Sequence, residues 1–143
     1  MIKSWEHVGI SVRSLEASMR FYCGLLGLER VGEIERFEGP LYEKIMGLQG
    51  ASGRVALLKS ADVQIELFEF ASPPARVGDP HRPVCDHGIT HFAIKVADIQ
   101  SAYAGLRAAG VPFHCEPLDM GGIWATYGRD PDGNVFELVE LPR

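Results

Sequence analysis

The stretch His7-Val8-Gly9-Ile10-Ser11-Val12 alternates in polarity, and the stretch His91-Phe92-Ala93-Ile94-Lys95-Val96 repeats its pattern further along the chain. Successive side chains of a strand point to opposite faces, so both stretches predict a β-strand with one buried face. A helix signal follows each stretch, with Ser14 and Asp98 as the expected N-caps and Gly110 as the expected end of the second helix. The chain therefore contains the same strand–helix pattern twice.

The two halves also end alike. Residues 64–69 (QIELFE) and 135–140 (VFELVE) each predict a closing strand. Each half has room for two further strands, one of them expected at residues 55–58 and 123–127, and a short helix is expected to open at Pro40. Residues 130–133 (DPDG) have the composition of a type I turn before the last strand. Each half therefore predicts a βαβββ module, and the fold class is α+β with two tandem modules.

A stretch rich in proline lies between the halves. We expect module one over about residues 5–71, a linker over about 72–87 and module two over about 88–141, all within a single domain of residues 1–143.

The composition is that of an ordinary globular protein, with 46% hydrophobic and 23% charged residues and a formal net charge of −5. The absence of a Lys/Arg cluster argues against a nucleic-acid partner, and no apolar run is long enough to span a membrane. The first residues lack a signal-peptide pattern, so a cytoplasmic location is expected. The three cysteines are odd in number and match no CxxC spacing, which predicts buried, inert thiols.

Strand alternation places His7 and His91 on the face opposite the apolar residues of their strands. Glu66 and Glu137 lie in apolar rows of the closing strands, where an unpaired carboxylate would be costly. If a pseudo-twofold axis relates the halves, these four residues converge on one point. Two imidazoles and two carboxylates suit a divalent ion such as nickel, cobalt, manganese, iron or zinc.

The other ionisable candidates receive a simpler interpretation. Glu69 and Glu140 have the opposite strand parity, so we expect them to face away from the ion. His81, His87 and His114 have no counterpart in the repeat and are expected to be solvated.

These motifs resemble the vicinal oxygen chelate superfamily, which includes glyoxalase I, extradiol dioxygenases and bleomycin-resistance proteins. The resemblance runs from residues 7–12 through Phe21-Tyr22 and residues 25–28 (LLGL) to residues 130–134 (DPDGN) and 136–138 (FEL). It implies two βαβββ modules that form a cup-shaped mixed sheet around a central metal site, often completed in a homodimer. The metal-ligand positions of the family fall on His7, Glu66, His91 and Glu137.

The resemblance also implies a metal-dependent lyase or isomerase of the glyoxalase I type, whose small substrate chelates the metal through vicinal oxygens and reacts through an enediolate or enolate. Glu66 and Glu137 would be the catalytic residues that move the proton. The glutathione-anchoring positions of glyoxalase I fall on Ser11 and Phe70, so glutathione conjugates are not expected as substrates. The aromatic residues expected to contact an apolar substrate are Phe68, Phe70, Trp124 and Tyr127.

Two alternatives remain open at this point. One is an extradiol-type, ring-cleaving dioxygenase, which would need ferrous iron held by two histidines and one carboxylate. The other, of a different class, is a non-catalytic protein of the bleomycin-resistance type that sequesters a small molecule and usually lacks the metal ligands.

Overall fold

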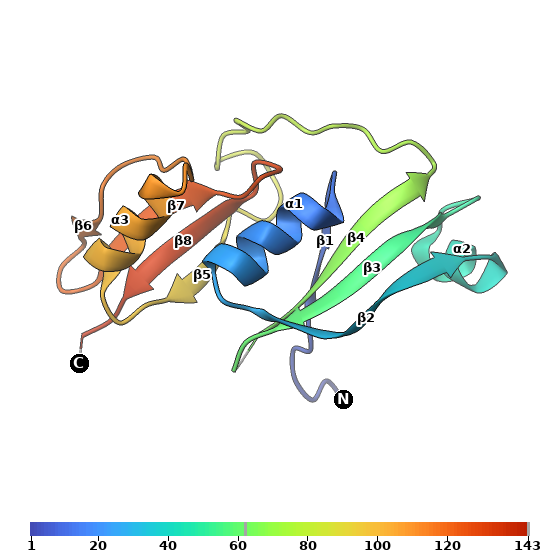
Figure 1. The fold of residues 1–143 in the computed structure, drawn as a ribbon, viewed down its shortest axis with the longest axis horizontal. Coiled ribbons are helices and arrows are strands. Elements are labelled where there is room, and N and C mark those ends of the chain that lie inside the picture. The colour runs from blue at the N-terminus through green and yellow to red at the C-terminus, as the bar shows by residue number, and fades with distance from the viewer. Residues whose placement is uncertain (62, 143) are drawn as a thin grey trace. The chain divides into compact units, whose positions relative to one another are not determined.

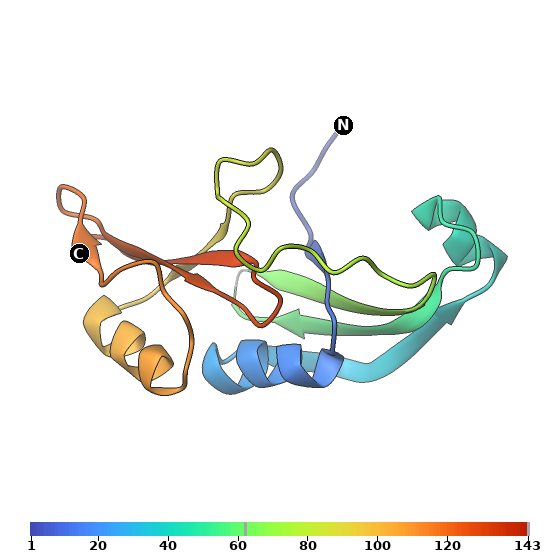
Figure 2. The ribbon, with the colours of Figure 1, turned by 90° about the horizontal axis from the view of Figure 1, so that it is seen from above.

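The computed structural model describes residues 1–61 and 63–142 and forms two compact units. Unit 1 is Met1–Val77, and unit 2 begins at Gly78, inside the stretch that the sequence predicts as a linker. Each unit contains one four-stranded sheet, and the helix that follows its first strand lies against one face of that sheet (Figures 1 and 2). The predicted α+β class with two tandem modules is confirmed.

Unit 1 has its strands in the spatial order β1-β4-β3-β2, with β1 parallel to β4 and the other pairs antiparallel. The short helix predicted to open at Pro40 is present between the second and third strands. In chain order the elements are β1 (Val8–Ser11), α1 (Leu15–Met19), η1 (Arg20–Leu25), β2 (Glu29–Glu38), α2 (Pro40–Met46), β3 (Ser52–Lys59) and β4 (Gln64–Ser72).

Unit 2 repeats this topology in the order β5-β8-β7-β6, with β5 parallel to β8. Its elements are β5 (Phe92–Lys95), α3 (Ile99–Ala108), β6 (Leu118–Asp119), β7 (Trp124–Arg129) and β8 (Val135–Glu140). In both units the first and last strands are therefore neighbours, which brings the start of the first strand beside the closing strand.

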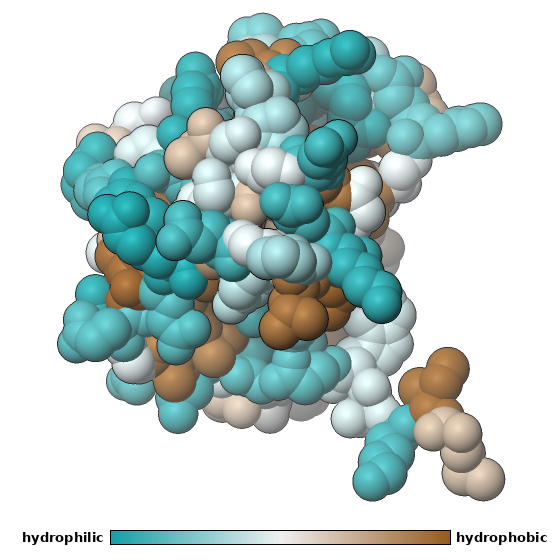
Figure 3. Space-filling model, turned by 90° about the vertical axis from the view of Figure 1, so that its right-hand side faces the viewer, coloured by the Kyte–Doolittle hydropathy of each residue, from teal (hydrophilic) through white to brown (hydrophobic). Residues whose placement is uncertain are grey.

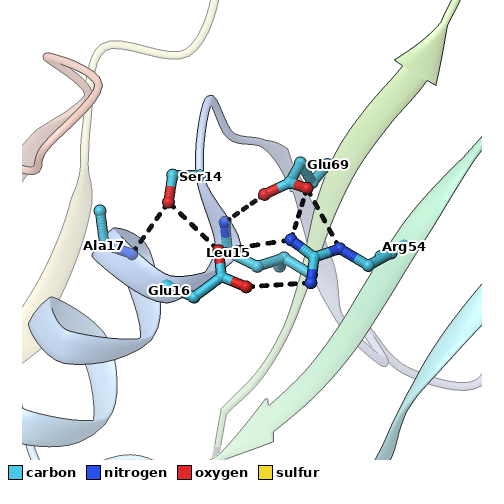
Figure 4. Close-up of polar contacts among 6 residues, drawn as sticks. All are labelled: Ser14, Leu15, Glu16, Ala17, Arg54 and Glu69. Atoms are coloured by element: carbon cyan, nitrogen blue, oxygen red, sulfur yellow. Dashed lines mark hydrogen bonds and ion pairs between the residues drawn. The ribbon is translucent and has the colours of Figure 1, made fainter.

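The N-terminus of α1 is held by two side chains (Figure 4). The hydroxyl of Ser14 accepts a hydrogen bond from the amide of Ala17 at 3.2 Å, so the predicted N-cap is confirmed. The carboxylate of Glu69 on β4 accepts from the amide of Leu15 at 2.7 Å and pairs with Arg54 at 2.6 Å. Two amides of the first turn that have no partner within the helix thereby find hydrogen-bond acceptors, one of which is a side chain of the sheet.

The N-terminus of α3 has the same arrangement. Asp98 accepts from the amide of Ser101 at 3.0 Å, as predicted, and Glu140 on β8 accepts from the amide of Ile99 at 2.8 Å. Glu69 and Glu140 thus face the helices, as their strand parity predicts.

The core of each unit lies between the sheet and its helix. The largest fully buried side chains of unit 1 include Leu15, Tyr22, Leu58 and Leu67, and those of unit 2 are Ile99, Phe136 and Leu138. The strand residues among these face the helix, whereas Phe37, also fully buried, lies on the opposite face of the unit 1 sheet. The opposite faces of the two sheets also carry His7, Glu66, His91 and Glu137.

Three features differ from the sequence-based expectations. The first helix continues as a π-helix over Arg20–Leu25, which the sequence did not predict. The sequence also did not predict the position of the ten-residue strand β2. The prediction of buried cysteines is wrong, because Cys85 and Cys115 are exposed; they lie in non-helical, non-strand segments rather than on a periodic apolar face. Cys23 is half-buried, and burial raises the pKa of its thiol.

No helix in the described part of the chain is long and apolar enough to cross a membrane. The face shown in Figure 3, on the side where α2 lies in Figure 1, is mostly hydrophilic with separate hydrophobic areas. Helix α2 itself exposes Leu41 and Ile45.

Candidate metal centre

The parallel pairing of β1 and β4 brings His7 beside Glu66. Gly9 lies opposite Glu66 in this register, and His7 directly precedes β1 on the same side. The Nε2 atom of His7 lies 3.1 Å from Oε2 of Glu66. A Cβ at position 9 would be in ordinary van der Waals contact with the ring of Phe68, at 3.5 Å.

The parallel pairing of β5 and β8 produces the same arrangement in unit 2. Ala93 lies opposite Glu137, and Nε2 of His91 lies 3.2 Å from Oε2 of Glu137. The sequence repeat therefore corresponds to a repeated His–Glu pair with the same atoms facing each other.

The spacing of these atoms fits ligands of one divalent ion. Two bonds of about 2.1 Å place their ligand atoms about 3.0 Å apart at an octahedral angle and about 3.4 Å apart at a tetrahedral angle. The observed distances of 3.1 and 3.2 Å fall in this interval. The donor set, one imidazole nitrogen and one carboxylate oxygen in each pair, also suits a borderline divalent metal.

Both pairs remain accessible to a ligand. The side chains of His7 and Glu66 are 38% and 28% exposed, and those of His91 and Glu137 are 26% and 19% exposed. The hydrogen bond to Glu6 raises the pKa of His7; burial opposes this shift, and the negative charge of Glu66 reinforces it. The surroundings of His7 therefore stabilise the protonated ring, which must lose its proton before Nε2 can bind a metal.

Each pair supplies two donors. In the described part of either unit, no group of three or more His, Cys, Asp or Glu side chains is placed to hold an ion. The convergence of His7, Glu66, His91 and Glu137 on one ion stays a prediction.

The predicted substrate-contacting residues of unit 1 lie on the face that carries Glu66. Phe68 and Phe70 stack with ring centroids 6.2 Å apart, and Phe37 contacts both at 5.7 and 5.2 Å. Tyr42 extends this aromatic group at 5.7 Å from Phe37. Phe37 and Tyr42 were not singled out from the sequence, because β2, which carries Phe37, has charged residues along its length and shows no clean alternation.

In unit 2 only one of the two predicted aromatic residues lies beside the pair. Tyr127 is opposite Glu137 across β7 and β8, and its ring centroid is 4.7 Å from that of His91. Trp124 is opposite Glu140, on the alternate face of the sheet. Trp124 therefore points away from the face that carries His91 and Glu137.

His114 is a further neighbour of Tyr127, with ring centroids 6.1 Å apart. His114 is exposed, as expected. Partial desolvation of its imidazole and the positive charge of Arg129 lower its pKa. It lines a cavity of about 400 Å³ together with Arg129, Phe113 and His81. His81 and His87 are exposed as well.

Comparisons with known proteins identify the family to which this fold belongs. The family model described as the Glyoxalase/Bleomycin resistance protein/Dioxygenase superfamily matches residues 4–138. The chain is 32% identical to the uncharacterized protein YaeR of Escherichia coli K12, with 97% of each chain covered, and 29% identical to a 2-epi-5-epi-valiolone epimerase from Actinomyces, with 96% of this chain and 79% of the relative covered.

Among solved structures, a glyoxalase family protein from Bacillus cereus superposes with a TM-score of 0.91 at 24% identity, covering 100% of this chain and 97% of the other. At this identity the superposition establishes the fold alone. With the repeated βαβββ modules and the family match over nearly the whole sequence, the chain belongs to the glyoxalase/bleomycin resistance protein/dioxygenase superfamily.

Proposed function

We propose that this protein is a metal-dependent lyase or isomerase of the glyoxalase-like kind, acting on a small substrate with two adjacent oxygens. His7, Glu66, His91 and Glu137 would together hold one divalent ion of nickel, cobalt, manganese, zinc or iron. The observation that carries the proposal is the repeated contact between a histidine Nε2 and a glutamate Oε2, at 3.1 Å in unit 1 and 3.2 Å in unit 2. One such pair alone would be an ordinary polar contact. Its repetition at matched positions of the two units favours a shared role in metal binding.

When bound, the ion would act as a Lewis acid toward the substrate oxygens and stabilise negative charge that develops on them. Glu66 and Glu137 would exchange a proton with the substrate carbon next to its carbonyl group. A carboxylate in this role must come within hydrogen-bond reach of the proton that it moves. The side chains of Glu66 and Glu137 are 28% and 19% exposed, so a small substrate can approach both.

The aromatic residues would contact the part of the substrate that carries no ligand oxygens. Phe68 and Phe70 lie along β4 on the face of Glu66, and Tyr127 lies opposite Glu137. Burial of apolar area against such rings supplies binding energy that does not depend on the metal. A substrate with an apolar or aromatic substituent beside its two oxygens fits this surface.

The relative named as an epimerase, at 29% identity, supports a reaction of the isomerase class. Epimerisation next to a carbonyl group requires removal and return of a proton, which is the step assigned here to the two glutamates. We also propose that the protein acts as a homodimer, which sedimentation velocity would test directly.

The experiment measures the replacement of a substrate hydrogen by deuterium from the solvent. Metal-reconstituted protein is incubated in D₂O with 2-oxoaldehyde adducts, 2-oxo thioesters and hydroxyketones, and exchange at the carbon beside the carbonyl is followed by NMR. We expect metal-dependent exchange that falls by about 10²–10⁴-fold in Glu66→Gln or Glu137→Gln, the usual contribution of a positioned acid or base. His87→Ala, which alters an exposed histidine outside the pairs, is the matched control.

Two results would replace this proposal. Oxygen uptake with catechols in the presence of ferrous iron would identify a ring-cleaving dioxygenase, an activity that the superfamily description includes. Binding of small molecules with no metal requirement and no change in Glu137→Gln would identify a sequestering protein.

A further inference from the structure

In both units, the residue directly before the histidine contacts the histidine ring. Nδ1 of His7 contacts the carboxylate of Glu6, and Nδ1 of His91 lies 3.1 Å from the hydroxyl oxygen of Thr90. The other ring nitrogen, Nε2, faces the glutamate of the same unit in each case. Glu6 and Thr90 therefore hold matched places in the repeat and make the same kind of contact.

We propose that Glu6 and Thr90 are positioning residues that orient the two histidines for metal binding, an inference that rests on the proposed function. A hydrogen bond from Nδ1–H to the preceding side chain fixes the ring orientation and leaves the lone pair of Nε2 free for the ion. Both residues contact Nδ1 and not Nε2, the ring nitrogen that would bind the ion.

The two units hold their histidines with unequal strength. Glu6 offers a charged acceptor, and charge-assisted hydrogen bonds are about twice as strong as neutral ones such as that to Thr90. The second carboxylate oxygen of Glu6 accepts a hydrogen bond from Nε2 of Gln64 at 2.8 Å. Gln64 lies two residues before Glu66 on β4, so one strand positions both the carboxylate and the histidine of unit 1.

The contact of Glu6 with Gln64 matters because Glu6 is itself 67% exposed. An exposed carboxylate contact to a neighbouring residue contributes little to the stability of the folded chain. Its removal is therefore expected to leave the stability of the metal-free protein nearly unchanged. The effect is instead expected in the affinity for a metal, which depends on the ring being oriented in advance.

The test compares Co²⁺ affinity among variants of the full chain, measured by competition with a chelator. We expect Glu6→Ala to weaken Co²⁺ binding by about 10–100-fold, the usual effect of losing such a partner, and Glu6→Gln to recover part of the loss because its amide oxygen still accepts. Thr90→Val should weaken binding less than Glu6→Ala. Glu43→Ala, which removes a carboxylate from α2, is the control for the change in charge and should bind as the wild type does.

A spectroscopic measurement separates orientation from general damage. In the Co²⁺-loaded protein, the Nδ1–H protons of bound imidazoles give strongly shifted NMR signals that survive only when a hydrogen bond slows exchange with water. We expect the His7 signal to be lost in Glu6→Ala and kept in Glu6→Gln, with unchanged thermal unfolding of the metal-free variants.

The outcomes distinguish this inference from the function it rests on. Equal Co²⁺ affinity and an unchanged His7 signal in Glu6→Ala would overturn the inference while leaving the metal site in place. Wild-type protein that binds no Co²⁺, or binds it equally after His7→Ala, would overturn the proposed function and the inference with it.

Discussion

Ser18 is a buried hydroxyl in the core of unit 1. Its side chain is fully buried in α1, and its oxygen has no hydrogen-bond partner within residues 1–61 and 63–142. A buried polar group without a partner costs about 1–3 kcal/mol, and alanine is also the better helix former. We expect Ser18→Ala to raise the free energy of unfolding by about 1 kcal/mol in urea titrations.

Ser101 provides the comparison for this prediction. Its hydroxyl donates to the carboxylate of Asp98 at 2.7 Å, so Ser101→Ala should lower stability rather than raise it. A loss of stability in Ser18→Ala would show that the buried hydroxyl is satisfied in solution.

Two glycines of unit 2 should respond to alanine with opposite signs. A Cβ at Gly128 would come within 2.5 Å of the Phe136 ring, whereas a Cβ at Gly105 in α3 would meet nothing within 4 Å. Gly128→Ala should therefore cost about 1–3 kcal/mol through overpacking, and Gly105→Ala should gain about 0.5–1 kcal/mol of helix stability. Chemical denaturation of the two variants tests this, and equal effects would contradict the close packing at β7.

Strand alternation predicted the sheet faces of the glutamates correctly, but the aromatic candidates were chosen without it. Glu66 lies on the face of His7, whereas Glu69 points to the helix, because the two glutamates have opposite strand parity. Trp124 was grouped with Tyr127 without regard to parity, although an odd spacing puts them on opposite faces of β7.

At the level of elements, the N-cap of α3 makes unit 2 sensitive to acid. Backbone and side-chain hydrogen bonds from Ser101 lower the pKa of Asp98 below its usual value. A carboxyl group whose pKa is lower in the folded state than in the unfolded state stabilises the fold. The stabilisation is complete when the pH is above the unfolded-state pKa, and it is lost as the pH falls through the folded-state pKa.

Asp98→Asn keeps a capping oxygen and removes the ionisation. We therefore expect the difference in unfolding free energy between wild type and Asp98→Asn to be largest near neutral pH and to shrink as the pH falls through the lowered pKa of Asp98. Asp86→Asn, a substitution of the same kind in the linker, is the control for the effect of removing one carboxylate on the free energy of unfolding. A difference that stays constant with pH would contradict a role for the charge.

Elements with strong local signals were predicted, and those without them were not. Helices α1 and α3 begin directly after the capping residues Ser14 and Asp98. Helix α2 begins at Pro40, whose fixed backbone angle suits the first position of a helix. Strand β2 is an edge strand with charged residues along its length and an irregular register after Val31, so it shows no clean alternation. The π-helical turn over Arg20–Leu25 has no sequence signal of comparable strength.

At the level of the whole molecule, the internal repeat was the decisive source of information. Matching strands, caps and glutamates in both halves predicted two βαβββ modules, and the element order of the structure and the family match over residues 4–138 agree. The sharing of one ion by four residues depends on how two modules are brought together, and no local period or cap encodes that. Binding of one ion by all four residues therefore has to be measured directly.

The most direct measurement is the metal content per chain after reconstitution with Ni²⁺ or Co²⁺ and removal of excess ion, determined by elemental analysis. We expect one ion per wild-type chain, its loss in both His7→Ala and His91→Ala, and full retention in His87→Ala. Two ions per chain, with each substitution removing only one, would show that the pairs bind separately. Metal binding that depends on neither histidine would contradict the proposed site.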